Sequence, residues 1–163
     1  LAARQDFALD ATIVTHGPDG ERRLPAASFF LGLYQTELAT DELIVAIEVP
    51  MAPAGVRVAA LELARRRGDF AIAGLLAQAV ADGGRLMDVR TAIFGVADRP
   101  LRLTAVEAAL TGVPDIAAAK AVLARDLKPN GDLTHSPAAK SHLVGVLIER
   151  AVRHLLQTPG ATA

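Results

Sequence analysis

The sequence predicts an α+β fold in which antiparallel strands come first and helices follow. Apolar and polar residues alternate, as is typical of strands, only in the first two thirds of the chain. Two strong turn signals, Pro18-Asp19-Gly20 and Asp82-Gly83-Gly84, fall between such segments and predict antiparallel hairpins. After Pro100 the apolar residues recur at helical spacing. Strands followed by helices are typical of the α+β class.

The composition is that of an ordinary globular chain. Of its 163 residues, 52% are hydrophobic and 21% are charged, and the net charge is −1. This near-neutral balance gives no electrostatic footprint for nucleic acid or an anionic membrane. Without cysteine the chain has no disulfide and cannot bind an iron–sulfur cluster through thiolates. The longest apolar run is far below the ~20 residues that span a bilayer, so we expect a soluble, cytoplasmic protein.

Residues 1–50 are expected to form the C-terminal part of one domain. A β-branched run over residues 12–15 predicts a strand, and residues 21–24 are its hairpin partner. Residues 25–31 read as a connector with room for one helical turn. Residues 43–49 alternate as a further strand, which Pro50 ends.

Residues 51–163 are expected to form a small α+β domain with a three-stranded antiparallel sheet. The domain boundary falls at the loop 51–55, and a strand follows over residues 56–64. Residues 70–81 favour helix by their alanine and leucine content, but the glycine turn after them favours a hairpin, so we predict a buried strand. In its partner, residues 86–96, one face is expected to hold Met87, Val89, Thr91 and Ile93, opposed to Asp88 and Arg90.

Three helices are expected after residue 103. Thr104 and Glu107 have the spacing of a capping box before a short helix. Asp115 can cap a second helix over residues 116–127. Ser136-Pro137 begins the longest helix, whose apolar stripe is expected to pack on the hairpin of residues 70–96. The stripe consists of Leu143, Val144, Leu147, Ile148, Ala151, Val152 and Leu155.

Residues 65–74 place three arginines before a glycine, a carboxylate and an apolar run. Guanidinium groups pair bidentately with carboxylates, so Arg65 to Asp69 can build a fixed polar joint. A solvated charge run that closes one strand before the next is the alternative. A buried pair between Arg66 and Asp69 would be architecture rather than acid–base chemistry.

The order of four motifs carries a resemblance to a known family. They are Phe29 to Thr36, Asp41 to Ile44, Ile47 to Pro50, and the run Arg65-Arg66-x-Gly68-Asp69-Phe70-Ala71. Together they resemble the flavin (medium) subunit of the molybdenum hydroxylases, the group of xanthine dehydrogenase and aerobic CO dehydrogenase. The resemblance spans about residues 8–155, the end of the flavin domain and the C-terminal domain.

The resemblance implies an electron-transfer flavoprotein component, or a fragment of one. In the family the intact subunit takes electrons from 2Fe-2S clusters, stores them on FAD and passes them to an external acceptor. The clusters belong to an iron–sulfur small subunit and molybdopterin to a large subunit, so both are expected on partners and not on this chain.

The resemblance also implies which residues contact the cofactor. Ile44 matches an aliphatic residue that packs at the isoalloxazine, and a strand buried on both faces is the alternative. Tyr34 lies in the aromatic segment that approaches the flavin, and a core aromatic is the alternative. Thr36 supplies the hydroxyl of that motif and Arg66 belongs to the Arg-Arg pair. Glu62 lies where the family often carries a lysine, which reverses the local charge.

Some chemistry has no candidates in the sequence. No good glycine-rich phosphate loop is present, and in the family such loops lie upstream of the matched region, so the chain alone should bind FAD weakly. The four histidines have no metal-ligand spacing, and no nucleophile–base arrangement stands out. Two other functions stay open: a non-catalytic domain that docks partner subunits without flavin, and a small-molecule binding module with no redox role.

Overall fold

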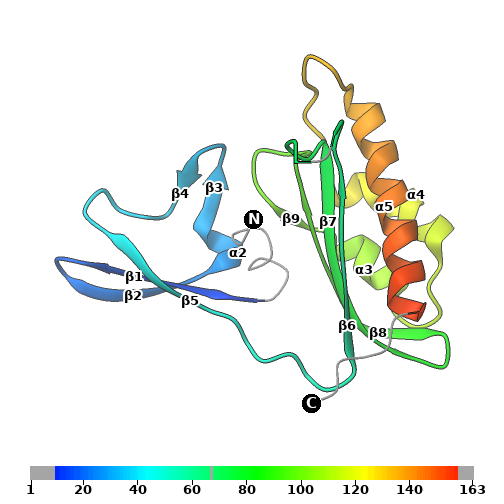
Figure 1. Ribbon diagram of the computed structural model, residues 1–163, viewed down its shortest axis with the longest axis horizontal. Coiled ribbons are helices and arrows are strands. Elements are labelled where there is room, and N and C mark those ends of the chain that lie inside the picture. Colours follow the sequence, from blue (N-terminus) through cyan, green and yellow to red (C-terminus); the bar gives the residue numbers. More distant parts are fainter. Residues whose placement is uncertain (1–9, 67, 158–163) are drawn as a thin grey trace.

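The computed structural model describes residues 10–66 and 68–157. In Figure 1 the strands form two separate groups, and helices accompany mainly the second. The elements of the first group are β1 (Thr12–Gly17), β2 (Gly20–Pro25), α2 (Ala26–Phe29), β3 (Phe30–Gly32), β4 (Gln35–Thr36) and β5 (Leu43–Glu48). Those of the second are β6 (Val56–Leu63), β7 (Ala73–Asp82), β8 (Arg85–Phe94), β9 (Leu101–Arg102), α3 (Thr104–Leu110), α4 (Ile116–Asp126) and α5 (Pro137–Gln157). This order confirms the predicted α+β class.

The first group is built on a three-stranded antiparallel sheet in the order β2-β1-β5. The predicted turn joins β1 to β2, and Gly20 supplies its positive φ of 101°. The connector contains one helical turn, α2, as expected. A small cluster of buried side chains lies beneath it, formed by Ala11, Ile13, Ala26 and Phe29. Strands β3 and β4 form a separate two-stranded ribbon.

The second group has a four-stranded antiparallel sheet in the order β6-β7-β8-β9. The expectation of three strands is wrong because the two-residue β9 pairs with β8. Strand, not helix, is confirmed for the apolar segment, but β7 begins at Ala73. Phe70, which the prediction placed in the buried strand, is 87% exposed.

A β-bulge corrects the predicted faces of β8. Asp88 has a φ of +51°, and the register with β7 shifts between Gln78 and Val80. The extra residue reverses the alternation toward the start of the strand. Leu86 is therefore buried and Met87 is exposed, the opposite of the prediction, whereas Val89, Thr91 and Ile93 are buried as expected.

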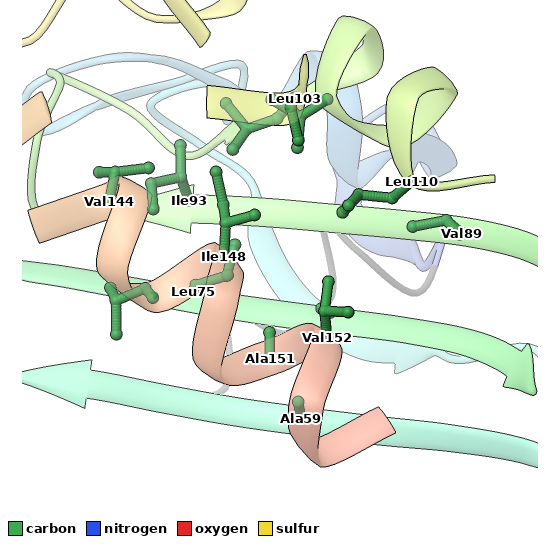
Figure 2. Packing of buried hydrophobic residues seen from close by; sticks show 14 of the residues in the cluster. Ala59, Leu75, Val89, Ile93, Leu103, Leu110, Val144, Ile148, Ala151 and Val152 are labelled. Carbon is green, nitrogen blue, oxygen red and sulfur yellow. The ribbon is translucent and has the colours of Figure 1, made fainter. Parts of the chain in front are cut away.

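The helices α3, α4 and α5 cover one face of the second sheet (Figure 1). Figure 2 shows Val144, Ile148 and Val152 of α5 directed at the sheet, where they pack with Leu75 and Ile93. The predicted stripe is confirmed, with Leu143 only half-buried at its edge. In the described part of the chain, no helix is both long and apolar enough to cross a membrane.

One of the two predicted helix caps is confirmed, at Asp115, and Ser136, predicted as the start of the longest helix, caps α5. The Asp115 side chain accepts a hydrogen bond from Ala118 N at 2.9 Å, and Ser136 Oγ accepts one from Ala139 N at 3.2 Å. Both caps are local, three residues before the N–H groups that they bind.

The capping box on α3 is wrong. The carboxylate of Asp126, at the end of α4, accepts hydrogen bonds from Ala105 N at 2.8 Å and Val106 N at 3.1 Å. Glu107 instead turns inward and accepts from Thr91 N at 2.8 Å. A cap from a neighbouring helix thus replaces the local one, and Glu107 is left for the core.

Candidate functional site

Tyr34 lies at the tip of the β3–β4 turn with its side chain 99% exposed. Its φ of +54° is in the left-handed region, which is uncommon for a residue other than glycine. The alternative of a core aromatic is therefore wrong. Thr36, on β4, pairs with Phe30 across the ribbon and is exposed as well. The turn presents an aromatic ring and a hydroxyl to the outside of this chain.

Ile44 lies on β5, the edge strand of the first sheet. It is 46% exposed, and its neighbours Leu43 and Val45 are more exposed still. The alternative of a strand buried on both faces is wrong in this structure. The edge strand thus exposes three consecutive apolar side chains.

A buried carboxylate fixes the start of β5. Glu42 is 8% exposed and accepts hydrogen bonds from Thr15 Oγ1 at 3.2 Å and from Ala39 N at 2.9 Å. Arg22 lies 3.4 Å from the same carboxylate. Glu42 thus holds the backbone in place two residues before Ile44.

Arg66 lies in the β6–β7 loop with its side chain 82% exposed. Its Nε is 3.4 Å from Asp69 Oδ2, and Arg65 is 3.8 Å from the same oxygen. Asp69 Oδ1 accepts a hydrogen bond from Phe70 N at 2.9 Å. Both arginines are solvated, and among the described residues Asp69 Oδ2 is buried without a hydrogen-bond partner, so neither the fixed bidentate joint nor the buried pair is formed. The third arginine of the motif, at position 67, lies outside the described residues.

The candidate residues lie on both groups of strands. Tyr34, Thr36 and Ile44 belong to the first group, whereas Arg66 follows β6 of the second. Glu62 is exposed on β6, in register with Gly74 of β7. In Figure 1 the β3–β4 ribbon and the β6–β7 connection lie toward the same end of the molecule. A ligand that contacts both sets has to bridge the two groups.

The chemistry of these groups fits the ring end of a flavin. An aromatic ring and an aliphatic side chain suit a flat apolar heterocycle, and a hydroxyl and a guanidinium suit its polar edge. The pyrophosphate fits less well. Carboxylates already occupy the starts of α3 and α4, and Ser136 caps α5. In residues 10–66 and 68–157, these helix N-termini are therefore not free to bind phosphate.

Sequence reasoning missed a network of charges around Glu107. This carboxylate is 8% exposed and accepts from Arg102 Nε at 3.1 Å and from Arg102 NH2 at 2.7 Å. Arg102 also lies 3.6 Å from Asp10, which pairs with Arg90. The spacing of these residues along the chain does not predict the contacts, because the partners come from different strands and a helix.

A cavity of about 440 Å³ lies beside the network. Its lining combines Asp10, which precedes β1, with the connection between the two sheets and side chains of the second sheet: Pro50, Met51, Ala52, Pro53, Val56, Gln78, Ala79, Val80, Asp88 and Arg90. The cavity shows that the connection does not pack tightly against the second sheet.

Two family models match the chain in succession. The CO dehydrogenase flavoprotein C-terminal domain matches residues 59–155. The FAD binding domain in molybdopterin dehydrogenase matches residues 7–52. The two matches correspond to the second and first groups of strands.

Medium chains of several dehydrogenases and hydroxylases align with most of this chain. The carbon monoxide dehydrogenase medium chain of Hydrogenophaga pseudoflava is 34% identical over 90% of this chain and 52% of its own length. The glyceraldehyde dehydrogenase medium chain of Sulfolobus acidocaldarius is 30% identical over 91% and 54%. The nicotine 6-hydroxylase medium subunit of Paenarthrobacter nicotinovorans is 32% identical over 90% and 52%.

Solved structures show the same fold. Carbon monoxide dehydrogenase from H. pseudoflava superposes with a TM-score of 0.86 at 34% identity, over 94% of this chain and 55% of the other. Quinoline 2-oxidoreductase from Pseudomonas putida 86 superposes with a TM-score of 0.84 at 26% identity, over 95% and 55%. The chain thus spans about half the length of the proteins that it matches.

Proposed function

The chain belongs to the family of CO dehydrogenase flavoprotein C-terminal domains, and from this premise we propose that it serves in the FAD-binding medium subunit of a molybdenum hydroxylase. The observation that carries the proposal is the succession of a FAD-binding match and a flavoprotein C-terminal match on two groups of strands. When bound, FAD supplies the electron relay of such a complex, between iron–sulfur clusters and an external acceptor.

The residues proposed for the cofactor come from both groups. Tyr34 and Ile44 offer apolar surface to the isoalloxazine, and both are exposed and available for it. Thr36 and Arg66 offer a hydroxyl and a cation to its polar edge. Glu62 adds a carboxylate, so it opposes the charge of Arg66 and weakens the attraction of an anionic group to this point.

The proposed assembly contains two other kinds of subunit. An iron–sulfur small subunit would deliver electrons, and a molybdopterin large subunit would carry out the hydroxylation. The absence of cysteine supports this division, because thiolate ligands for a cluster must then come from another chain or segment. We place the complex in the cytoplasm.

We also propose a domain boundary at residues 50/51. Residues 1–50 would be the C-terminal part of the flavin-binding domain, and residues 51–163 the small C-terminal domain. The break between the two family matches, at residues 53–58, supports this division. So does the separation of the sheet β2-β1-β5 from the sheet β6-β7-β8-β9.

The FAD released from the purified complex on denaturation, measured by its fluorescence, tests the proposal, because iron–sulfur clusters also absorb visible light and would mask the flavin bands. The wild type should release FAD, and Ile44→Asp should lower the released amount because a charge at the ring disfavours binding. Val113→Asp is the matched control, since Val113 is an exposed aliphatic residue outside the proposed site. A wild-type complex that releases no FAD would contradict the proposal and favour an interaction domain without flavin.

Residues 1–163 alone should bind FAD weakly. The N-termini of α3, α4 and α5 are already capped, so the pyrophosphate would forgo charge-assisted hydrogen bonds there. Titration of the isolated chain, followed by flavin fluorescence, measures this. A submicromolar dissociation constant would show that the chain holds a phosphate site of its own.

A further inference from the structure

The two groups of strands are joined by a connection that does not hold them in place. Residues 49–54 are exposed, including both prolines, Pro50 and Pro53. The cavity of about 440 Å³ separates part of this connection from the second sheet. The relative position of the groups must therefore depend on contacts made elsewhere.

An aromatic pair makes the apolar contact between the groups. Phe29 is 2% exposed in the small cluster of the first group. Phe30, next in the chain, packs both on this cluster and on Leu76 and Ala92, on the face of the second sheet opposite the helices. The two rings meet edge to face, with centroids 5.2 Å apart and planes at 88°. Phe30 thus contacts both groups.

Three arginines of the second group make the polar contacts. Arg99, between β8 and β9, donates from NH1 to the carbonyl oxygen of Phe30 at 3.3 Å. Arg90 of β8 pairs with Asp10, and Arg102 of β9 lies 3.6 Å from the same carboxylate. The chain next to Asp10 is held close to the aromatic pair. The carbonyl oxygen of Ala11 accepts a hydrogen bond from Ala26 N, at the start of α2, and α2 ends at Phe29.

A buried group holds one of these arginines in place. Glu107 of α3 receives both nitrogens of Arg102 in a bidentate pair, at 3.1 and 2.7 Å. The same carboxylate accepts from Thr91 N and Oγ1, at 2.8 and 3.1 Å. Bidentate pairs fix direction as well as distance. Glu107 thus fixes the position of the Arg102 guanidinium on the second group, and Asp10 pairs with this fixed cation.

From these contacts we infer that Asp10, Phe30, Arg90, Arg99 and Arg102 form a joint that positions the β3–β4 turn against the second sheet. Phe30 is the first residue of β3 and leads directly into the turn that carries Tyr34. The functional consequence rests on the proposed function. If Tyr34 and Arg66 both contact the flavin, this joint sets the relative position of the two residues. Asp10 and Arg99 are positioning residues, because they act through the turn.

The distance between two spin labels tests the joint directly and needs no flavin. The chain has no cysteine, so Leu33→Cys and Phe70→Cys place unique labels on exposed sites in the β3–β4 turn and the β6–β7 loop. Asp10→Asn and Arg99→Ala, alone and together, should shift or broaden the distance distribution, most in the double variant. Arg23→Ala is the matched control, because its partners Glu21 and Glu48 lie within the first sheet.

A second measurement, the flavin reduction potential in the assembled complex, tests the consequence. The potential should shift in the double variant and stay at the wild-type value in Arg23→Ala. With Arg99→Lys in place of Arg99→Ala, the double variant keeps a cationic donor, so its potential should return part of the way to the wild-type value. An unchanged distance distribution in the double variant would overturn the joint. A changed distribution with an unchanged potential would overturn its positioning role. If the wild-type complex holds no flavin, the proposed function fails, and the label distances still decide whether the joint exists.

Discussion

Arg57 on β6 caps the C-terminal end of α5 by a hydrogen bond to the carbonyl oxygen of Leu155. Its NH1 donates to the carbonyl oxygen of Leu155 at 2.9 Å and to that of Leu156 at 3.0 Å. The last carbonyls of a helix have no partner within the helix and carry its negative dipole end, so a cation there is favourable. A strand residue thereby anchors a helix that begins 80 positions later, at Pro137.

Arg57→Ala should lower the free energy of unfolding by about 2 kcal/mol, because it removes two hydrogen bonds from a charged donor to helix carbonyls. Chemical denaturation measures the change. Arg57→Lys should cost less, since one nitrogen makes both bonds and an ammonium can replace it. Lysine also lacks Nε, which in the described part of the chain is buried without a hydrogen-bond partner. Equal losses for both variants would show that the fork geometry matters.

Glu107→Gln should lower the free energy of unfolding by about 3 kcal/mol, because the buried carboxylate is the bidentate partner of Arg102 and its loss leaves that guanidinium only the more distant carboxylate of Asp10, at 3.6 Å. The shift of the urea midpoint measures this loss. Glu21→Gln serves as the control, since the side chain of Glu21 is half exposed. A midpoint that moves no more than the control's would mean that Arg102 finds another partner.

Asp132 should make stability depend on acidic pH. The hydrogen bond from the Lys140 ammonium, followed by those from the Thr134 backbone and side chain, holds the pKa of Asp132 well below its usual range. The folded state therefore favours the ionised form. Its stabilisation is complete above the unfolded pKa of about 4 and is lost as pH falls below that value.

Asp132→Asn should remove this part of the acid dependence and leave the rest. Melting temperatures measured from neutral pH down to the acid limit of solubility would show it as a difference that shrinks at low pH. Asp19→Asn is a suitable control, because Asp19 lies in the exposed β1–β2 turn. A constant difference between Asp132→Asn and wild type at every pH would contradict the assignment.

Deletion of residues 137–163 should unfold or aggregate the chain. The deletion removes the α5 stripe that buries Leu75 and Ile93 of the second sheet (Figure 2). Burial of one Leu or Ile side chain contributes roughly 1.5–3 kcal/mol, so the loss exceeds the stability of a typical domain. Deletion of residues 158–163 alone should leave the melting temperature unchanged, since the stripe ends at Leu155. A long deletion that melts like the full chain would make α5 a docking arm.

The sequence by itself determined the elements whose signals are local. The β1–β2 and β7–β8 hairpins follow from their turn residues, and the caps at Asp115 and Ser136 lie within three residues of the groups they bind. The stripe of α5 follows from helical spacing. Each of these features depends on neighbours in the chain, so reading the residues in order was enough.

Only the tertiary structure decided which partner a side chain takes when several compete. Glu107 has the spacing to cap its own helix, yet Thr91 and Arg102 offer it hydrogen bonds in the core, and Asp126 caps α3 in its place. Likewise Phe29 and Phe30 read alike in the sequence, but Phe29 is buried within the first group whereas Phe30 packs on both groups. The reason is physical: a buried charge or ring is stabilised by whatever surrounds it in space, and residues far apart in the chain supply those surroundings only once both sheets have formed.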